Sequence, residues 1–353
     1  MKKIILITGS TGLVGSESVK FFLEKRFTVV GIDNNKTKFF FGNEGSTYWI
    51  KKKLIQNKRY IHHNISVTNY NQLKELFDKY KKKILLIIHC AAQPSHDWAY
   101  KDPLIDFDIN SKSTLYLLEL LRKFSPKAKF ILTSTNKVYG DNPNKLRYLE
   151  KSTRFELDSK NEFFNGISEK MSIDDCKHSL FGVSKTYGDL ITQEYGKNYG
   201  LKTIVFRAGC ISGPNHSGAL LHGFLSYLVK SCILKKEYTI IGYKGKQVRD
   251  NIHSYDLVKC FWEFFRTKDQ KGGEVYNIGG GRKSNCSILE AIEYIEKRLK
   301  LNVSKKFLNK SRIGDHKWYV SDNSKFKKHY PNWKQKYNYK MIINEIINQL
   351  ISK

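Results

Sequence analysis

The chain has 353 residues, 40% of them hydrophobic, and its formal net charge is +29. Because of this length and hydrophobic content, it can bury a large core and form one large domain with a smaller one. Its apolar stretches are shorter than the about 20 residues of a membrane span, so we expect a soluble, cytoplasmic protein without a membrane partner. Its six cysteines form no CxxC pair and its lysines are spread along the chain. These patterns argue against a disulfide framework, a metal site and a nucleic-acid partner, and they favour solvated lysine faces that attract an anionic substrate.

The first residues carry a nucleotide-binding pattern. Lys3–Thr8 is a short apolar run typical of a buried parallel strand. Gly9, Gly12 and Gly15 follow it, and a helix is predicted to begin near Leu13. Such glycines permit a tight turn, a close approach of a pyrophosphate and close packing of helix on strand, while the helix start directs its N–H groups at the phosphates.

The second predicted strand, Phe27–Ile32, ends at an acidic residue. Asp33 follows Gly15 by 18 residues and can accept hydrogen bonds from both hydroxyls of an adenosine ribose. A carboxylate there repels a 2′-phosphate. The opening unit therefore predicts a dinucleotide site that prefers NAD to NADP.

Strands and helices alternate far beyond this unit. We expect strands at Tyr60–His63, Ile84–His89, Lys129–Thr133 and Thr203–Arg207, and helices at Tyr70–Lys82, Leu104–Lys123 and Phe181–Asn198. Tyr238–Gly242 and His253–Phe265 are expected as a further strand and helix that cross back to the same sheet. This alternation predicts an α/β fold, a doubly wound parallel Rossmann sheet with a smaller C-terminal α/β substrate lobe.

The predicted domains are discontinuous. Residues 1–206 plus about 238–266 are assigned to the NAD-binding domain, and about 207–237 plus 267–353 to the substrate lobe. Asn142–Ser179 is long, polar and irregular, which is typical of a functional loop or lid.

Several motifs in chain order resemble the extended short-chain dehydrogenase/reductase family, the nucleotide-sugar epimerases and dehydratases. They are TGSTGLVG at the glycine loop, HCAAQ at His89–Gln93, NSKST from Asn110, FILTSTNKVYGD at Phe130–Asp141, LFGVSK at Leu180–Lys185, KGKQVRDNIHSYDLV at Lys244–Val258 and SRIGDHKWYVSD around Arg312. The resemblance covers essentially the whole chain. Within the family, STNKVYGD, the long loop and GKQVRD resemble enzymes that epimerise CDP-linked deoxyhexoses.

The resemblance assigns roles residue by residue. Thr135 would hydrogen-bond the reacting hydroxyl or carbonyl, and Lys185 would hold the nicotinamide ribose. It implies cofactor contacts from Gly9, Thr11, Gly12, Leu13, Val14, Gly15, Asp33, Asn34, Asn64, Ile65, Ala91, Ala92, Gln93, Asn110, Thr133, Lys185 and Ala208. It implies substrate contacts from Gln93, Asn136, Lys137, Arg249 and Arg312, and no metal ligand.

Two departures from the family pattern shape the expected chemistry. The 4,6-dehydratases usually carry Asp–Glu after the active-site Thr, whereas this chain has Asn136 and Lys137, which disfavours dehydration. The family's general-base Tyr, four residues before the Lys, is replaced by Phe181. A phenyl ring cannot accept or return a proton.

Three explanations of Phe181 remain open at this point. Another group could move the proton, and the candidates are Tyr139, Cys176, His178, Lys137 and Tyr187, with His178 preferred because imidazole titrates near neutral pH. Thr135 and Lys185 could suffice through a water molecule. Alternatively, the hydride chemistry is lost and the protein only binds NAD and a nucleotide sugar.

The resemblance implies an NAD-dependent isomerase of carbohydrate biosynthesis, of the kind that supplies lipopolysaccharide. NAD would take a hydride from one sugar carbon, expected to be carbon 2, and return it to the opposite face without an external reductant. A nucleotide-sugar reductase and a 4,6-dehydratase-like enzyme are the catalytic alternatives. Leu104–Lys123 and Phe181–Asn198 would pair across a homodimer or homotetramer interface.

Overall fold

The computed structural model describes residues 3–216, 223–309 and 314–352. The chain folds into two compact units, each built from several segments. The first unit comprises Met1–Thr135, Leu180–Arg207 and Val258–Tyr276, and the second comprises Asn136–Ser179, Ala208–Leu257 and Asn277–Lys353. Each unit therefore draws on residues that lie far apart in the sequence.

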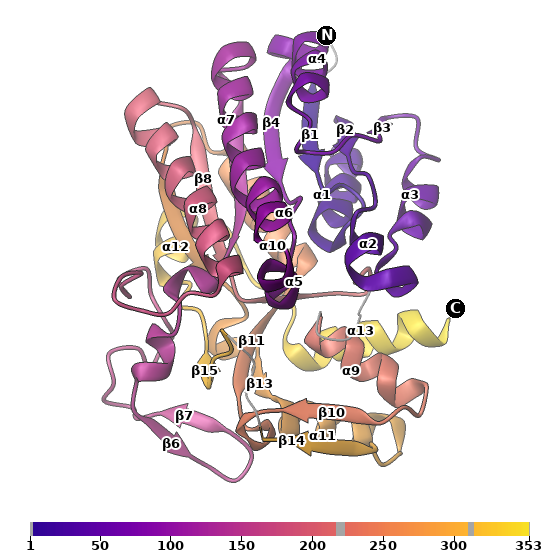
Figure 1. Ribbon diagram of the computed structural model, residues 1–353, viewed down its shortest axis with the longest axis vertical. Coiled ribbons are helices and arrows are strands. Elements are labelled where there is room, and N and C mark those ends of the chain that lie inside the picture. The colour runs from indigo at the N-terminus through magenta and orange to yellow at the C-terminus, as the bar shows by residue number, and fades with distance from the viewer. Residues whose placement is uncertain (1–2, 217–222, 310–313, 353) are drawn as a thin grey trace. The chain divides into compact units, whose positions relative to one another are not determined.

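A seven-stranded sheet forms the centre of the first unit (Figure 1). Its strand order is β12-β8-β5-β4-β1-β2-β3, and the pairs β1–β2, β1–β4, β2–β3 and β4–β5 are parallel. The strands are β1 (Ile4–Thr8), β2 (Thr28–Ile32), β3 (Tyr60–His63), β4 (Ile84–His89), β5 (Lys129–Thr135), β8 (Thr203–Ala208) and β12 (Glu274–Ile278). Strand order reverses between β1 and β4, where open α/β sheets bind ligands beyond the carboxyl ends of their strands.

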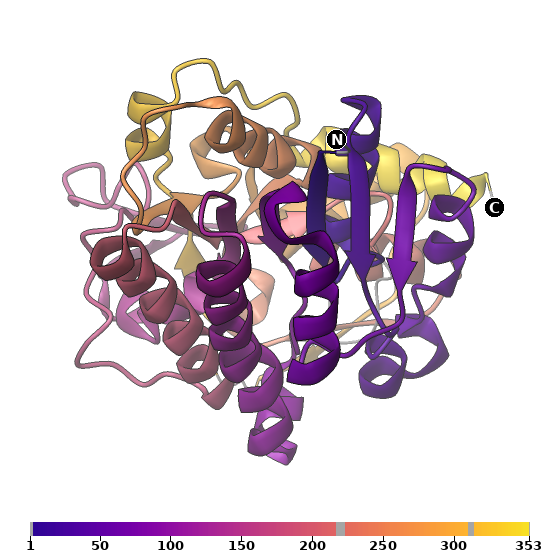
Figure 2. The ribbon, with the colours of Figure 1, turned by 90° about the horizontal axis from the view of Figure 1, so that it is seen from above.

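Helices cover both faces of this sheet, as expected for a doubly wound fold. They are α1 (Leu13–Glu24), α2 (Thr37–Phe41), α3 (Tyr48–Leu54), α4 (Tyr70–Tyr80), α5 (His96–Lys101), α6 (Pro103–Phe107), α7 (Ser113–Phe124), α8 (Leu180–Tyr199) and α10 (Ser254–Arg266). Helices α7 and α8 pack side by side, which Figures 1 and 2 show from two directions. On the other face, Phe21 and Phe22 of α1 pack edge-on against Trp262 of α10.

The second unit contains smaller sheets and a helical cluster. Strand β11 (Val248–His253) pairs with β9 (Cys210–Ser212), β13 (Asn285–Ser287) and β15 (Trp318–Tyr319). Strand β10 (Tyr238–Ile241) pairs with β14 (Lys305–Leu308), and β6 (Tyr148–Glu150) with β7 (Phe155–Leu157). The helices are α9 (Phe224–Ile233), α11 (Ile288–Leu299), α12 (Ser324–His329) and α13 (Tyr339–Ile351), and α9, α11 and α13 share one apolar core.

The expected fold class is confirmed, and one local expectation is wrong. Tyr238–Ile241 does not join the large sheet but pairs with β14. Its residues alternate between buried and half-buried, which suits a sheet with one covered face, whereas the strands at the centre of the large sheet are covered on both faces. The seventh strand of the large sheet is Glu274–Ile278 instead. The expected helix Leu104–Lys123 is confirmed as one continuous helical stretch, which consists of α6, a π-helical segment (Asp108–Lys112) and α7. Asn142–Ser179 contains the β6–β7 hairpin.

The expected domain boundaries also differ from the two units. The expected switch from the NAD-binding domain to the substrate lobe near residue 207 agrees with the boundary between Arg207 and Ala208. However, residues 136–179 and 238–257 belong to the second unit, and residues 267–276 belong to the first. The reason is that the chain leaves the large sheet directly after β5 and returns to it only with α8, so the loop between them packs with residues 208–257.

Candidate functional site

The glycine loop after β1 is closed by backbone packing that excludes larger residues. Gly9 has a φ of +64°, and a Cβ there would lie 2.7 Å from the backbone N of Ala91 in the loop after β4. A Cβ on Gly15 would lie 2.0 Å from the carbonyl O of Gly9. A side chain at residue 9 would push the glycine loop away from the loop after β4, and a side chain at residue 15 would push α1 away from the glycine loop. The loop is therefore built around backbone atoms alone.

Helix α1 presents a bare amino end to this loop. Its N-cap residue is Gly12, no side chain caps it, and its first turn carries no acidic residue. The first N–H groups of a helix lack partners within the helix, and the helix dipole adds positive charge there. The amino end of α1, which begins at Leu13 and Val14, thus has the properties of a pyrophosphate site.

Asp33 is held at the carboxyl end of β2 by two backbone amides. Its Oδ2 accepts from the N–H of Thr11 at 3.0 Å and its Oδ1 from the N–H of Asn35 at 2.7 Å. Each carboxylate oxygen keeps a further lone pair. This arrangement fits the two hydroxyls of an adenosine ribose and disfavours a 2′-phosphate.

Two neighbouring features complete the adenosine side. A pocket of about 560 Å³ next to Asp33 is lined by Asn34, Asn35, Lys36, Lys38 and Phe39. Asn64 is exposed and Ile65 half-buried directly after β3, the strand beside β2. These residues lie near the glycine loop and Asp33 in the sheet, and their contacts with NAD stay a prediction.

Asn110 connects the loop after β4 to helix α8. Its side-chain oxygen accepts from the N–H of Gln93 at 3.0 Å, and its Nδ2 donates to the Gln93 carbonyl at 3.0 Å and to Ser184 Oγ at 3.2 Å. It lies in the π-helical segment, whose extra residue per turn marks functional positions in many helices. Ala91 and Ala92, in the same loop, are half-buried.

The side chain of Gln93 is fully buried and occupied. Its Nε2 donates to Asp106 Oδ1 at 2.7 Å and to the Ser95 carbonyl at 2.8 Å, and its Oε1 accepts from the Ser95 N–H. Asp106 itself is 2% exposed, and burial raises its pKa. These contacts give the Gln93 side chain a role in positioning the loop after β4, and its contact with cofactor or substrate stays a prediction.

Lys185 lies buried beside the end of β5. Its Nζ donates to the Thr133 carbonyl at 2.9 Å, and burial lowers its pKa to about 8. Thr133 Oγ1 lies 3.4 Å from Cys90 Sγ, and burial raises the pKa of that thiol to about 12. Thr135, two residues beyond Thr133, ends β5. The expected pair Thr135 and Lys185 is thus carried by adjacent elements, since α8 packs on β5.

A buried ion pair, which the sequence analysis missed, fixes α8 to the sheet. Asp189 accepts from Arg207 of β8 in a two-pronged contact, at 2.9 and 3.0 Å, and from Ser134 Oγ of β5 at 2.7 Å. The side chains of Asp189 and Arg207 are 0% and 6% exposed. Asp189 follows Lys185 by one helical turn, a spacing that could have suggested a shared face.

Phe181, at the position of the family's Tyr, faces a histidine that the sequence analysis did not consider. Its ring centroid lies 4.9 Å from that of His96, at an interplanar angle of 60°. Phe181 is 8% exposed and His96 is half-buried. His96 is the first residue of α5, far from α8 in sequence, so no local pattern links the two.

Three candidates for the missing proton carrier lie between β5 and α8, and their surroundings differ. The Tyr139 hydroxyl is buried and donates to Asn277 Oδ1 at 2.8 Å. His178 Nε2 lies 2.7 Å from the Val138 carbonyl. Burial raises the pKa of Cys176. All three belong to the second unit.

Tyr187, another of these candidates, lies on α8 itself. Tyr187 follows Lys185 by two residues, which is about 200° around an α-helix. Its ring packs against Phe107 of α6, with centroids 5.9 Å apart. Tyr187 therefore lies on a different face of α8 from Phe181 and Lys185, which are one turn apart.

The residues expected to hold the substrate lie in the second unit. Asn136 is buried, and Lys137 Nζ donates to the Gly314 carbonyl at 2.8 Å. Arg249 of β11 pairs with Asp315 and is 11% exposed. Arg312 lies outside the described residues. Ala208, expected near the cofactor, is buried at the end of β8.

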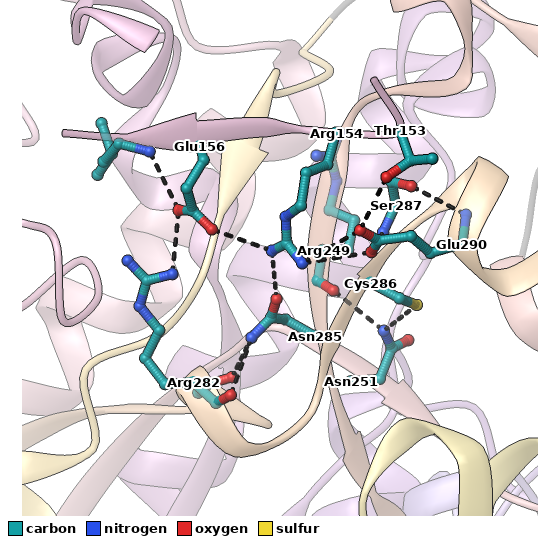
Figure 3. Close-up of polar contacts among 12 residues, drawn as sticks. Thr153, Arg154, Glu156, Arg249, Asn251, Arg282, Asn285, Cys286, Ser287 and Glu290 are labelled. Atoms are coloured by element: carbon teal, nitrogen blue, oxygen red, sulfur yellow. Dashed lines mark hydrogen bonds and ion pairs between the residues drawn. The ribbon is translucent and has the colours of Figure 1, made fainter. Parts of the chain in front are cut away.

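A polar network braces the strand next to Arg249 (Figure 3). Arg249 is paired in register with Cys286 of β13. Strand β13 leads into α11, and Ser287 and Glu290 form a capping box at the amino end of that helix. Arg154, from the β6–β7 hairpin, lies 3.3 Å from Glu290 and donates to Asn285. The hairpin is therefore anchored to the strand and helix that support Arg249.

The described part of the chain offers neither a metal centre nor a membrane span. Within it, no group of three or more His, Cys, Asp or Glu residues is arranged to hold a metal ion. Among the helices described, none is long and apolar enough to cross a membrane.

Comparison with known proteins gives a consistent result. Residues 5–279 match the model of the NAD dependent epimerase/dehydratase family. The chain is 30% identical over 327 residues to CDP-paratose 2-epimerase of Salmonella typhi, covering 91% of each protein. It is 27% identical to UDP-glucuronate 4-epimerase of Thermodesulfobacterium geofontis, covering 92% of this chain and 88% of that one.

A solved structure agrees with these sequence relatives. UDP-glucuronic acid 4-epimerase of Bacillus cereus, in complex with UDP-glucuronic acid and NAD, superposes with a TM-score of 0.79 at 25% identity, and the match covers 99% of both chains. The glycine loop, the uncapped start of α1 and the Asp33 carboxylate have the chemistry of an NAD site, which is compatible with this relationship. The chain belongs to the NAD dependent epimerase/dehydratase family, the NAD-dependent enzymes that act on nucleotide sugars.

Proposed function

We propose that this protein epimerises a nucleotide-diphosphate sugar at carbon 2, with a CDP-linked deoxyhexose as substrate. The similarity to CDP-paratose 2-epimerase over 91% of the chain supports this choice. Bound NAD supplies a reversible hydride acceptor for such a reaction. Arg249 would hold the diphosphate together with Arg312, and Thr135 would hydrogen-bond the oxygen of the reacting carbon.

The residues after Thr135 carry the preference for epimerisation over dehydration. Loss of water from a sugar requires an acid that protonates the departing hydroxyl. Asn136 has no titratable group, and the ammonium of Lys137 donates to the Gly314 carbonyl. Epimerisation needs no departing hydroxyl, so the two side chains are compatible with it.

The roles within the first unit follow from its contacts. Lys185 is fixed by the Thr133 carbonyl and brings positive charge to the end of β5. Asn110 and Gln93 hold the loop after β4 against α8. Asp189 and Arg207 hold α8 itself, so the position of Lys185 is set by buried contacts on both sides. Such preorganisation keeps a charged group in place while the substrate changes.

The test of this function is direct. The purified protein should release NAD on denaturation, as identified by mass spectrometry, and should convert CDP-paratose to its 2-epimer without added NADH or NADPH. A requirement for stoichiometric reductant would replace the proposal with a nucleotide-sugar reductase. Formation of a 4-keto-6-deoxy product from a nucleotide hexose would replace it with a dehydratase.

Phe181 gives a specific reason to keep a second candidate, a non-catalytic protein that binds NAD and a nucleotide sugar. Phe181 offers no proton to the reaction. Such a protein would bind CDP-paratose in calorimetry and leave it unchanged after prolonged incubation. The presence of Thr135 and Lys185 at the end of β5 favours the catalytic proposal.

We also propose a homodimer or homotetramer in which α6 and α8 face a second copy. The exposed apolar side chains Leu104, Phe107, Val183 and Leu190 are 79%, 47%, 54% and 42% exposed, and all lie on these two helices. Apolar residues gathered on one surface favour association. Sedimentation at micromolar concentration should give at least the dimer mass, and a monomer would refute the proposal.

A further inference from the structure

The family's catalytic Tyr is absent, yet its place is not isolated from titratable groups. Phe181 contacts the imidazole of His96 at 4.9 Å between ring centroids, which is within the range of ordinary aromatic contacts. Phe181 also lies one helical turn before Lys185, so the two share a face of α8. A titratable ring therefore lies beside the aromatic residue that precedes the lysine by one turn.

The backbone that carries His96 is fixed by buried hydrogen bonds. Ser95, directly before it, is bound through its N–H and its carbonyl to the side chain of Gln93. Gln93 is held in turn by Asp106, at 2.7 Å from its Nε2. Ser95 also caps α5 by accepting from the Trp98 N–H. His96 is thus the first residue after a rigid turn.

The same network fixes Phe181. Asn110 donates to Ser184 Oγ, and that hydroxyl donates to the Phe181 carbonyl at 3.0 Å. Asn110 also holds both backbone groups of Gln93. One buried asparagine therefore sets the positions of α8 and of the loop that leads to His96. This shared support is what a reacting group needs for a constant geometry.

We propose that His96 is the catalytic acid and base that replaces the missing tyrosine, an inference that rests on the proposed epimerase function. In the first half-reaction the sugar hydroxyl gives its proton to an imidazole nitrogen as its carbon gives a hydride to NAD, and the C–O bond becomes C=O. In the second half-reaction the hydride returns to the opposite face of that carbon. The imidazolium then returns the proton to the oxygen.

Chemistry and surroundings both support this role. Imidazole accepts and returns protons near neutral pH, which phenylalanine cannot do. Phe181 provides an apolar wall on one side of His96, while the half-buried position leaves part of the ring accessible. The charged residues of α5 are Asp97 and Lys101, α6 carries Asp106, and the first two turns of α8 carry Lys185.

The first experiment measures turnover of CDP-paratose by His96→Gln, by His96→Asn and by the matched control His329→Gln, an exposed histidine of α12. General acid–base catalysis contributes roughly 10²–10⁴-fold. We expect both His96 variants to lose at least 100-fold in kcat, while His329→Gln stays within twofold. Loss of less than threefold in both His96 variants would overturn the proposal.

The second experiment tests rescue. Phe181→Tyr restores the phenol beside Lys185, so it should raise kcat of His96→Gln at least tenfold. A purely structural role of His96 predicts no rescue, because a hydroxyl on residue 181 does not repair a misplaced helix. Absence of rescue would therefore refute the acid–base role even if His96→Gln were inactive.

The third experiment does not depend on turnover. Diethyl pyrocarbonate should modify His96, and bound NAD and CDP should protect His96 from modification, as measured by peptide mass spectrometry. Equal modification with and without NAD and CDP would contradict the location of His96 at the site. Calorimetry should give His96→Gln an affinity for NAD within twofold of the parent protein. If the parent protein turns over no nucleotide sugar while His96 is protected, the proposed epimerase function fails and the location of His96 at the site stands.

Discussion

Replacement of Asp189 by Asn should destabilise the protein far more than loss of an exposed ion pair. Asp189 is 0% exposed and accepts from Arg207, whose side chain is 6% exposed, and from Ser134. The substitution keeps the shape of the side chain but leaves the Arg207 charge buried without its counter-charge. Removal of one partner of such a pair costs about 3–5 kcal/mol.

The retained amide oxygen of Asn can still accept one hydrogen bond, so we expect the lower end of that range, about 3 kcal/mol. With a urea slope of about 3 kcal/mol per molar, the unfolding midpoint should fall by about 1 M. Circular dichroism in urea measures this shift. The slope itself should be unchanged, because the same surface is exposed on unfolding.

The matched control is Glu194→Gln on the same helix. Glu194 pairs with Lys197 at 3.3 Å, and the two side chains are 51% and 53% exposed. An exposed pair contributes about 0–1 kcal/mol, because water and salt screen it. Equal midpoints for Asp189→Asn and Glu194→Gln would refute the conclusion that a buried ion pair fixes α8 to the sheet.

Three further predictions concern the first unit. Gly15→Ala should weaken NAD binding at least tenfold in calorimetry, because the added Cβ would lie 2.0 Å from the Gly9 carbonyl O. Gly12→Ala should weaken NAD binding less, because its Cβ would lie 3.3 Å from the same atom. Equal losses of affinity in the two variants would contradict the packing argument. Asp33→Asn should lower the affinity for NAD relative to NADP, and an unchanged ratio would refute its ribose role. Burial, and to a smaller extent the charge of Lys185, lower the pKa of His89 to about 3. As the pH falls, the unfolded chain therefore binds a proton at His89 before the folded protein does, and the free energy of unfolding decreases below about pH 6.5, by about 1.4 kcal/mol at pH 5.5. His89→Gln should make the urea midpoint less dependent on pH, and an unchanged pH dependence would contradict the lowered pKa of His89.

The sequence predicted the opening unit with little error because local chemistry determines it. The apolar run of β1, the three glycines and Asp33 each carry their signal within a few residues. The expected strand at Lys129–Thr133 likewise appears as β5, Lys129–Thr135. These elements are buried parallel strands, which are nearly continuous apolar runs.

Other elements depended on tertiary partners. Tyr238–Ile241 has a strand pattern, but the sequence does not state that β14 is its partner. The last strand of the large sheet, Glu274–Ile278, begins with an acidic residue and follows a loop, so its apolar signal is short. The helix Leu104–Lys123 was predicted, but its π-helical segment was not, because Asn110 within that segment contacts Gln93 and Ser184, which lie elsewhere in the sequence.

The same contrast applies to the candidate site. Motifs identified Thr135, Lys185 and the unusual Phe181 without any structure. The contact of Phe181 with His96, and the ion pair of Asp189 with Arg207, join residues that only the fold brings together. A lone histidine after a strand carries no local signal for catalysis, which is why the motifs pointed to residues closer in sequence as replacements for the tyrosine.

The most direct test of the proposed reaction follows the hydrogen on carbon 2 of the sugar. CDP-paratose deuterated at that carbon should give a 2-epimer that keeps the deuterium, with catalytic NAD and no added reductant, as measured by NMR and mass spectrometry. Retention is the result predicted for a hydride that leaves and returns to the same carbon. Exchange of the deuterium for solvent hydrogen, or the absence of any epimer, would contradict the account.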